Sequence, residues 1–173
     1  QKNREMVFEL LASDMPAREV SPDPQSHFWQ QAELAGLDKA RYPSGRPGAG
    51  KDIPVDSVFH DASHPSIAVN LDACISCNLC ERACREVQVN DVIGMADRGM
   101  GTKPVFDVAD PMGLSTCVGC GECVQACPTG ALMEKTLLND TATKRDVFEV
   151  EVKPSVCPFC GVGCQTEVSV KDN

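Results

Sequence analysis

Apolar residues near the start of the chain recur at the spacing of an α-helix. Met6, Val7, Leu10 and Leu11 recur at helical spacing and fall on one side of a helix. This pattern is typical of a helix with one apolar face. The sequence therefore predicts an amphipathic helix over residues 3–12, with these four side chains on its packed face.

A second helix is predicted after the prolines at positions 22 and 24. Ser26 is suited to cap its N-terminus, and Gly36 is suited to end it. Phe28, Ala32 and Leu34 would supply its apolar contacts.

Residues 40–56 are dense in glycine and proline, which predicts an irregular linker. Within it, Gly45 to Lys51 has the spacing of a phosphate-binding loop. However, Asp52 stands where such a loop needs a serine or threonine, a proline lies inside the loop, and no apolar strand precedes it. We predict a surface turn there and no nucleotide site. Residues 1–65 are thus expected to form helices and a linker.

Two later stretches have the pattern of β-structure. Residues 89–108 alternate loosely and turn at Asp97–Gly101, which predicts a β-hairpin. Its Arg98 and Lys103 could contact a partner or belong to a solvated loop. Thr166–Val170 also alternates like a strand, but no strand follows it, and one strand cannot satisfy its backbone hydrogen bonds alone.

The two ends of the chain suggest a piece of a longer protein. The last strand lacks a returning partner, and Gln1 opens the chain without a methionine or a signal-like apolar run. We therefore expect further residues on the parent protein.

Composition narrows the classes of function. A net charge of −9 argues against nucleic acid or an anionic membrane surface as a partner. The sequence has no apolar run of about 18 residues that could span a bilayer. Eleven cysteines are many for 173 residues, and their odd number and close spacing disagree with a disulfide framework. Bound metal in a reducing compartment, the cytoplasm, is expected instead.

Eight of the cysteines form two copies of one motif. Each copy reads C-x2-C-x2-C-x3-C, and the second lies 43 residues after the first. This repetition predicts a duplicated module with pseudo-twofold symmetry. With this spacing, three cysteines wrap one 4Fe–4S cluster and the fourth reaches the other cluster. The predicted first set is Cys74, Cys77, Cys80 and Cys127, and the predicted second set is Cys117, Cys120, Cys123 and Cys84.

Residues next to these cysteines should shape the two sites. Gly119 and Gly121 suit a loop that turns backbone N–H groups toward cluster sulfurs. Because Arg85 follows Cys84, a helix is expected to continue there through Val87. Arg85 and its neighbour Arg82 could raise the potential of the second cluster, or they could form ordinary surface ion pairs.

Zinc is the main alternative for these eight cysteines. Two C-x2-C pairs could make a four-thiolate zinc site, but four other cysteines of the region would then have no role. The last three cysteines, Cys157, Cys160 and Cys164, stand at C-x2-C-x3-C and could hold three irons of a further cluster. His60 and His64 lie in a loop-like stretch away from any cysteine and are expected at the surface.

Three segments together carry a resemblance to a known family. VNLDACISCNLCERACREVQVNDVIGMADRGMG, STCVGCGECVQACPTGAL and VCPFCGVGC occur in this order. They resemble the large (alpha) subunit of the NAD-dependent formate dehydrogenases that contain molybdenum or tungsten. The resemblance covers essentially the whole chain and is most specific between Asn70 and Gln165.

The resemblance implies an α+β fold in three parts. A helical segment would precede a two-cluster ferredoxin-like domain at residues 66–136, into which the hairpin is inserted. Residues 137–173 would form a connector and the first β-strands of a molybdopterin oxidoreductase domain. The fourth ligand of the third 4Fe–4S cluster, and the molybdopterin dinucleotide with molybdenum or tungsten, would lie beyond residue 173.

The first third of the chain is also similar, more distantly, to the large iron–sulfur subunit of respiratory NADH dehydrogenase. In that family a cluster with one histidine and three cysteine ligands follows the first helix. Met15 stands where the histidine would be, and no cysteine precedes Cys74. This cluster is therefore not expected, since His27 alone cannot bind one.

The function implied by the resemblance is an electron relay. Electrons from formate, oxidised elsewhere in the subunit, would pass through this chain toward flavin and NAD on an iron–sulfur partner subunit. No residue of the chain is expected to be catalytic. The alternatives are a free-standing two-cluster ferredoxin, and an electron-input arm of a hydrogenase or a respiratory NADH dehydrogenase.

Overall fold

The computed structural model describes residues 2–37, 41–42, 60–138 and 151–170. Its helices are α1 (Lys2–Ala12), α2 (His27–Ala35), α3 (Leu79–Arg82) and α4 (Glu122–Ala126). Its strands are β1 (His60–Asp61), β2 (Ile67–Asn70), β3 (Ile93–Ala96), β4 (Lys103–Phe106), β5 (Leu132–Glu134), β6 (Glu151–Val156) and β7 (Gln165–Val170). The predicted turn at Gly45–Lys51 and most of the predicted linker lie outside the described residues.

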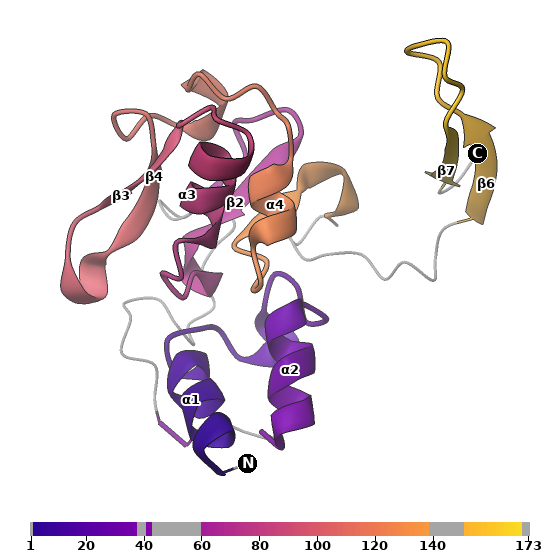
Figure 1. The fold of residues 1–173 in the computed structure, drawn as a ribbon. Coiled ribbons are helices and arrows are strands. Elements are labelled where there is room, and N and C mark those ends of the chain that lie inside the picture. The colour runs from indigo at the N-terminus through magenta and orange to yellow at the C-terminus, as the bar shows by residue number, and fades with distance from the viewer. Residues whose placement is uncertain (1, 38–40, 43–59, 139–150, 171–173) are drawn as a thin grey trace.

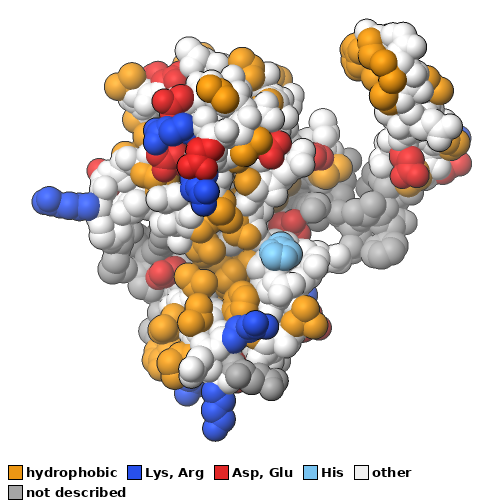
Figure 2. Space-filling model, in the orientation of Figure 1, with side chains coloured by type: hydrophobic (Ala, Val, Ile, Leu, Met, Phe, Trp, Pro, Cys, Tyr) orange, Lys and Arg blue, Asp and Glu red, His pale blue; other side chains and the backbone are white. Residues whose placement is uncertain are grey.

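Helix α1 confirms the predicted N-terminal helix but packs through a different face. Met6, Val7 and Leu10 are all more than half exposed, and hydrophobic side chains gather at the surface over α1 in the lower part of Figure 2. Instead, the ring of Phe8 meets that of Phe28 edge to face at 5.5 Å. The prediction is confirmed for Leu11, which packs against the buried cluster of Phe28, and is wrong for the other three side chains. Adjacent stripes of a helix differ by one residue in register, and only the position of α2 selects between them.

Glu9 is buried in α1, and Arg41 compensates its charge. Its Oε1 accepts hydrogen bonds from Arg41 N and Nε at 3.0 and 2.6 Å, and its Oε2 accepts one from Nη2 at 2.6 Å. The hydrogen bonds from the guanidinium lower the pKa of Glu9 to about 2. A carboxylate without this partner would be costly at a buried position.

Helix α2 begins after Ser26 and ends at Gly36, which adopts a left-handed conformation, as predicted. The side chain of Ser26, however, makes no capping hydrogen bond. Phe28 and Ala32 are buried, whereas Leu34 is 76% exposed, so the predicted contact of Leu34 is wrong. Leu34 lies about 200° around the helix from Ala32 and therefore faces away from the core.

The central sheet has the order β1-β2-β5 and is antiparallel throughout. All four residues of β2 are buried, and Ile67 and Val69 belong to the main apolar cluster. The short strands β1, β2 and β5 are absent from the predicted elements. β1 also begins before residue 66, and the predicted domain boundaries at 65/66 and 136/137 stay a prediction.

The N-terminal helices pack against the region that carries the cysteines (Figure 1). The backbone N–H of Phe28 donates to the carbonyl of Pro128 at 2.8 Å. Met15 and Trp29 belong to one buried apolar cluster with Ala73 and Ala131, which flank the cysteine motifs. Met15 is thus a buried packing residue, at the position expected to correspond to a histidine in the NADH dehydrogenase subunit.

The stretch after the first cysteine motif changes helix type and then bends sharply. Helix α3 continues as a π-helix over Ala83–Val87, so the predicted extension through Val87 is confirmed. Val89 and Asp91 then adopt left-handed conformations, with φ of 57° and 53°. Strands β3 and β4 follow and pair antiparallel within the predicted hairpin region. Lys103 of β4 lies 3.7 Å from Asp97, and both side chains are exposed.

Strands β6 and β7 form an antiparallel hairpin with Val156 opposite Gln165. The expectation that the last strand lacks a partner was therefore wrong, because the partner precedes it in sequence. Pro154 lies within β6 and obscures its strand pattern, since proline is unusual inside paired strands. The hairpin is almost entirely exposed and stands apart from the other elements in Figure 1.

None of the helices in the described part of the chain is long and apolar enough to cross a membrane.

Replacing Glu9 by Gln should loosen helix α1. The stabilisation from ionised Glu9 is complete above its ordinary pKa near 4.5 and is lost only as the pH falls toward 2, so the native protein has all of it at pH 7. The Glu9→Gln variant lacks the charge at every pH. Amide protons of α1 should then exchange several-fold faster with solvent at pH 7, as measured by hydrogen–deuterium exchange.

Glu33→Gln is the matched control. Glu33 pairs with Arg18 at 3.0 Å, but the side chains are 67% and 39% exposed, and such surface pairs contribute little. Equal exchange rates in α1 for the native protein and the Glu9→Gln variant would contradict the assigned role of Glu9.

Candidate metal centres

The first predicted set of cysteines surrounds one cavity. Cys74, Cys77, Cys80 and Cys127 all line it, although the last belongs to the second copy of the motif. Most of the remaining wall is apolar and comes from Ile75, Met95, Pro104, Ala131 and Leu132. We call this cavity the first site.

The second predicted set surrounds another cavity in the same way. Cys117, Cys120, Cys123 and Cys84 line it, and here Cys84 comes from the first copy. Ile67 of β2, Val92, Ile93 and Met112 supply apolar wall. We call this cavity the second site. The structure thus brings together four thiols at each site with the fourth cysteine exchanged between the copies.

Burial keeps the deepest thiols of both sites neutral. Burial first, and then the nearby sulfurs of Cys127, Cys74 and Cys77, raise the pKa of Cys80 to about 12. Burial, together with the sulfurs of Cys117, Cys120 and Cys84, likewise raises the pKa of Cys123 to about 12. Four thiolates in either cavity therefore need a compensating cation, and binding of that cation must displace protons.

The two copies repeat their backbone conformation as well as their cysteines. Ser76 and Gly119, which are 43 residues apart, both have positive φ, and each N–H donates to the cysteine sulfur two residues before it at 3.4 Å. Asn78 and Gly121 form a second pair with positive φ just before α3 and α4. The sequence pointed only to the glycines, because serine and asparagine do not by themselves indicate a left-handed conformation.

Further donors reach the cysteine sulfurs from outside the motifs. At the second site, Val92 N donates to Cys84 Sγ at 3.4 Å, and Asn90 Nδ2 donates to Cys120 Sγ at 3.9 Å. At the first site, the hydroxyl of Thr129 lies 3.7 Å from Cys127 Sγ. Such contacts outside the ligand set tune a metal centre.

His64 is buried and supports the second site, so the expectation of a surface histidine was wrong. It is only 6% exposed, and its Nδ1 accepts hydrogen bonds from the N–H groups of Ser66 and Ile67, each at 3.2 Å. A Cβ on Gly119 would lie 3.4 Å from Cε1 of this ring. Position 119 therefore has two reasons for glycine, its φ of +69° and the adjacent imidazole. Nothing in the linear spacing places His64 beside the second motif.

Residues 61–63 hold the loop before the second motif through two hydrogen bonds to its backbone. Asp61 Oδ2 accepts a hydrogen bond from Met112 N at 2.6 Å, and Ser63 Oγ accepts one from Gly113 N at 2.8 Å. A Cβ on Gly113 would lie 2.5 Å from the backbone of Ser63, so the two segments cross with no room for a side chain. Burial opposes ionisation of Asp61, but hydrogen bonds from Ser63 and Met112 together outweigh it and lower its pKa.

Arg82 and Arg85 form surface ion pairs, which was one of their two predicted roles. Arg82 pairs with Glu86 at 3.1 Å. Arg85 pairs with Glu81 at 3.0 Å and with Asp91 at 2.6 Å. Figure 2 shows these basic and acidic side chains interleaved over α3 in the upper part of the molecule. The arginines therefore present no uncompensated charge to the second site.

A zinc ion and a cluster need different spacings of their sulfur ligands. A zinc ion needs four sulfurs about 2.3 Å from one point. Among the described residues, no three His, Cys, Asp or Glu side chains converge closely enough to share one ion. Ligands at the corners of a cubane are spaced more widely, which agrees with thiols that ring a cavity.

The third set of cysteines lies in the connection between β6 and β7. Cys157 is half-buried, and Cys160 and Cys164 are exposed. The N–H of Cys157 donates to the carbonyl of Cys164 at 2.9 Å and closes the loop. Whether these three residues bind iron stays a prediction.

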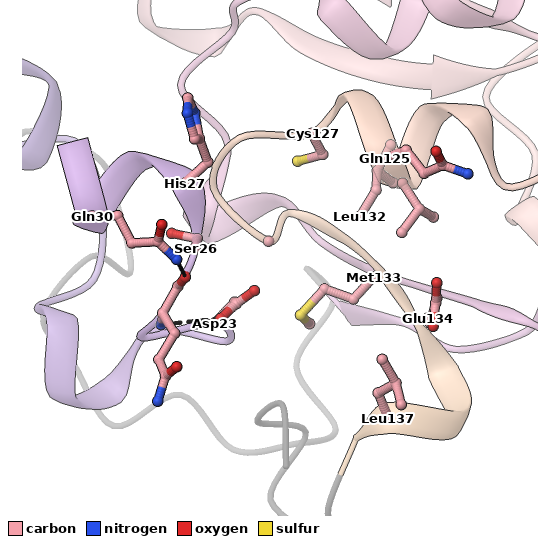
Figure 3. A pocket seen from close by; sticks show the side chains of 13 residues that line it. Asp23, Ser26, His27, Gln30, Gln125, Cys127, Leu132, Met133, Glu134 and Leu137 are labelled. Atoms are coloured by element: carbon pink, nitrogen blue, oxygen red, sulfur yellow. Dashed lines mark hydrogen bonds between the residues drawn. The ribbon is translucent and has the colours of Figure 1, made fainter. Parts of the chain in front are cut away.

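A separate pocket of about 440 Å³ lies beside the first site (Figure 3). Ser26, His27 and Gln30 line it from α2, and Met133 and Glu134 line it from β5. Cys127 and Leu132 line both this pocket and the first site. The pocket therefore adjoins the first site on the side of α2.

Comparison with known proteins identifies the family. Residues 73–131 and residues 116–167 each match the 4Fe-4S dicluster domain family, and together these matches span more than half of the chain. The chain belongs to this family. Its described fold, with mixed helices and strands around the paired motifs, agrees with this assignment.

Relatives with curated names are subunits of oxidoreductases. The alpha subunit of an NADPH-Fe(3+) oxidoreductase from Geobacter sulfurreducens is 36% identical over 164 residues, which are 95% of this chain and 18% of that protein. A NADH-quinone oxidoreductase subunit from Rhizobium meliloti is 34% identical over 129 residues, 72% of this chain and 14% of that protein. A protein of Staphylococcus haemolyticus, provisionally named a formate dehydrogenase, is 25% identical over 135 residues, 58% of this chain and 14% of that protein.

The chain spans less than a fifth of the length of these relatives. A solved NAD+-reducing NiFe hydrogenase in the H2-reduced state matches its fold with a TM-score of 0.60 at 20% identity, covering 78% of this chain and 54% of that one. These relatives support an iron–sulfur oxidoreductase family and do not single out formate dehydrogenases.

Replacing Asp61 by Asn should weaken the second site without touching a cysteine. The amide nitrogen cannot accept a hydrogen bond, so either Met112 N or Ser63 N loses its acceptor, at a cost of about 1–3 kcal/mol. In the iron-loaded protein we expect about half of the iron to be released faster to a chelator, followed by bleaching of the visible absorbance.

Asp97→Asn is the control, because Asp97 is exposed and lies 3.7 Å from Lys103. If both variants released iron at the same rate, the hydrogen bonds of Asp61 would not stabilise the second site.

Proposed function

We propose that this chain is an electron relay of a larger oxidoreductase and that each of its two sites holds one 4Fe–4S cluster. The observation that carries the proposal is the convergence of four thiols on each of two cavities, with the fourth thiol exchanged between the copies. This exchange is the ligand pattern of two-cluster ferredoxins. It also places the two sites side by side, since α3 packs against α4.

The residues at both sites suit such a cluster. Thiolates are the ligands that iron–sulfur clusters use. The N–H groups of Ser76 and Gly119 donate to cysteine sulfurs, and apolar side chains limit access of water. A bound 4Fe–4S cluster takes up and releases one electron at a time. The chain's own contribution is to hold two such groups close together in apolar surroundings.

The names of the relatives support a place between two redox sites. One name includes NADH and quinone, another includes NADPH and ferric iron, and a third includes formate. Hydride chemistry moves two electrons, whereas a cluster carries one, so a chain of clusters is needed between such sites. We infer that the rest of the parent protein, or a flavin- and NAD-binding partner subunit, supplies the reactions at both ends.

Within this class, we propose that electrons come from formate oxidised at a molybdopterin centre in the remainder of the same subunit. The ordered third motif at Cys157, Cys160 and Cys164 supports this version. An electron-input arm of a respiratory NADH dehydrogenase or a hydrogenase is the second candidate. It is supported by 34% identity to a NADH-quinone oxidoreductase subunit and by the hydrogenase-like fold.

Anaerobic reduction of the full-length complex separates the two candidates. Bleaching of the cluster absorbance by formate alone supports the first. Bleaching by NADH without any effect of formate supports the second. The relay itself is overturned if a fully iron-loaded complex reacts with neither donor, and also fails to react with dithionite.

Replacing Cys127 by Ala should damage the first site although Cys127 belongs to the second copy. The three remaining ligands, Cys74, Cys77 and Cys80, would leave one iron without its cysteine. Electron paramagnetic resonance of the reduced full-length protein should lose one cluster signal or convert it to a three-iron signal.

Cys84→Ala is the mirror variant and should affect the other signal. If both replacements altered the same signal, the exchanged ligand sets would be wrong.

Iron content tests the third set. The first and second sites account for about eight irons per chain, and occupancy of the third set in the full-length protein would add about four. Cys157→Ala should remove only this additional iron and leave the signals of the first two sites unchanged. The same iron content with and without this replacement would exclude Cys157 as a ligand.

A further inference from the structure

The two sites receive different hydrogen bonds from the protein. Each has one equivalent backbone donor, Ser76 N at the first site and Gly119 N at the second. The first site adds the hydroxyl of Thr129 beside Cys127. The second site adds Val92 N to Cys84 Sγ and the side-chain amide of Asn90 to Cys120 Sγ. Backbone N–H groups also contact Cys77 and Cys80 at the first site and Cys123 at the second. Asn90 is the side-chain amide among these donors.

The position of Asn90 is fixed by the backbone around it. Its N–H donates to the carbonyl of Cys84 at 2.9 Å. Its neighbours Val89 and Asp91 both adopt left-handed conformations, which are costly for any residue but glycine and especially for the β-branched valine. Strain of this kind persists where the surrounding structure requires a particular geometry. Here the bend turns the Asn90 amide toward the second site, whose wall it forms.

The equivalent position in the second copy carries no amide. Six residues after Cys127, the position that corresponds to Asn90 after Cys84, the chain carries Met133. Methionine has no hydrogen to donate. Met133 is buried and faces the separate pocket beside the first site (Figure 3). The asymmetry therefore arises where the two copies diverge after their fourth cysteine.

Charged groups do not account for a difference between the sites. Arg82 and Arg85 lie near the second site, but carboxylates of Glu86, Glu81 and Asp91 compensate them. The neutral Asn90 amide is therefore the polar side chain that distinguishes the second site.

We propose that Asn90 raises the reduction potential of the second site by donating to the ligand sulfur of Cys120. A hydrogen bond to a ligand sulfur stabilises the extra electron of the reduced form. The second site is thereby reduced more easily than it would be without this amide. The inference rests on the proposed function, because it concerns sites loaded with clusters.

Asn90→Leu removes the donor while keeping a side chain of similar size. In a redox titration of the full-length protein, followed by electron paramagnetic resonance, two reduction waves are expected from these two sites. The variant should move only one of the two waves, and move it downward. The shift should correspond to about a fivefold change in the reduction equilibrium, ~40 mV for a one-electron couple.

Two further variants keep the test independent of packing at position 90. Asn90→Asp retains the shape, removes the donor and adds negative charge, so it should lower the same wave further than Leu does. Asn90→Gln keeps a donor and should restore part of the shift. The role of the hydrogen bond is overturned if Asn90→Gln has a potential as low as that of Asn90→Leu. It is also overturned if Asn90→Asp keeps the native potential.

Thr129→Val is the matched control at the first site, because it removes the hydroxyl beside Cys127 with little change in volume. It should lower the other wave and leave the wave sensitive to Asn90 in place. The inference is overturned if Asn90→Leu moves neither wave in a fully iron-loaded protein, or moves the same wave as Thr129→Val. Absence of two cluster signals from the native full-length protein would instead refute the proposed function itself.

Discussion

Four thiols that face one apolar cavity are unfavourable neighbours unless iron is bound between them, and most of the described fold follows from this constraint. Their burial raises the pKa values of Cys80 and Cys123 to about 12, so the protein alone holds these sulfurs only in the protonated form. Cys84 and Cys123 are also members of the main apolar cluster, together with Ile67, Phe106 and Leu132. Site and core are therefore the same part of the molecule. In a domain this small, metal substitutes for apolar contacts that the chain cannot supply.

The exchange of the fourth cysteine ties the two copies into one unit. Because Cys127 reaches the first site and Cys84 reaches the second, neither copy can form a complete site without the other. The central sheet strengthens this connection, since β2 precedes the first motif and pairs with β5 after the second. Residues 61–64 also contact the loop that precedes the second motif, through hydrogen bonds from Met112 N and Gly113 N. Electron transfer benefits from this arrangement, because a rigid support keeps two neighbouring sites at a constant separation.

The two sites are nevertheless not equivalent. The N-terminal helices cover the first site, where Cys74 and Cys127 pack against the apolar cluster of Met15, Phe28 and Trp29. The second site is bounded by the π-helix and by the strained bend around Asn90. A duplicated sequence thus yields two environments, and different environments give two chemically identical groups different reduction potentials.

The cysteine spacing by itself determined which four thiols meet at each cavity, because three thiols two residues apart must share one loop and the fourth is carried out of its reach. The residue patterns also determined the existence of α1 and α2 and the continuation of the helix after Cys84. The pairing of β6 with β7 is local, but Pro154 obscures the strand pattern of β6. The packed face of α1 and the burial of Glu9 and His64 were decided only by the tertiary structure. Each depends on a partner remote in sequence, such as Arg41 for Glu9 or Gly119 for His64, and local periodicity contains no information about that partner. The same holds for Asn90, whose contact with Cys120 spans 30 residues and depends on a backbone bend that no local pattern predicts.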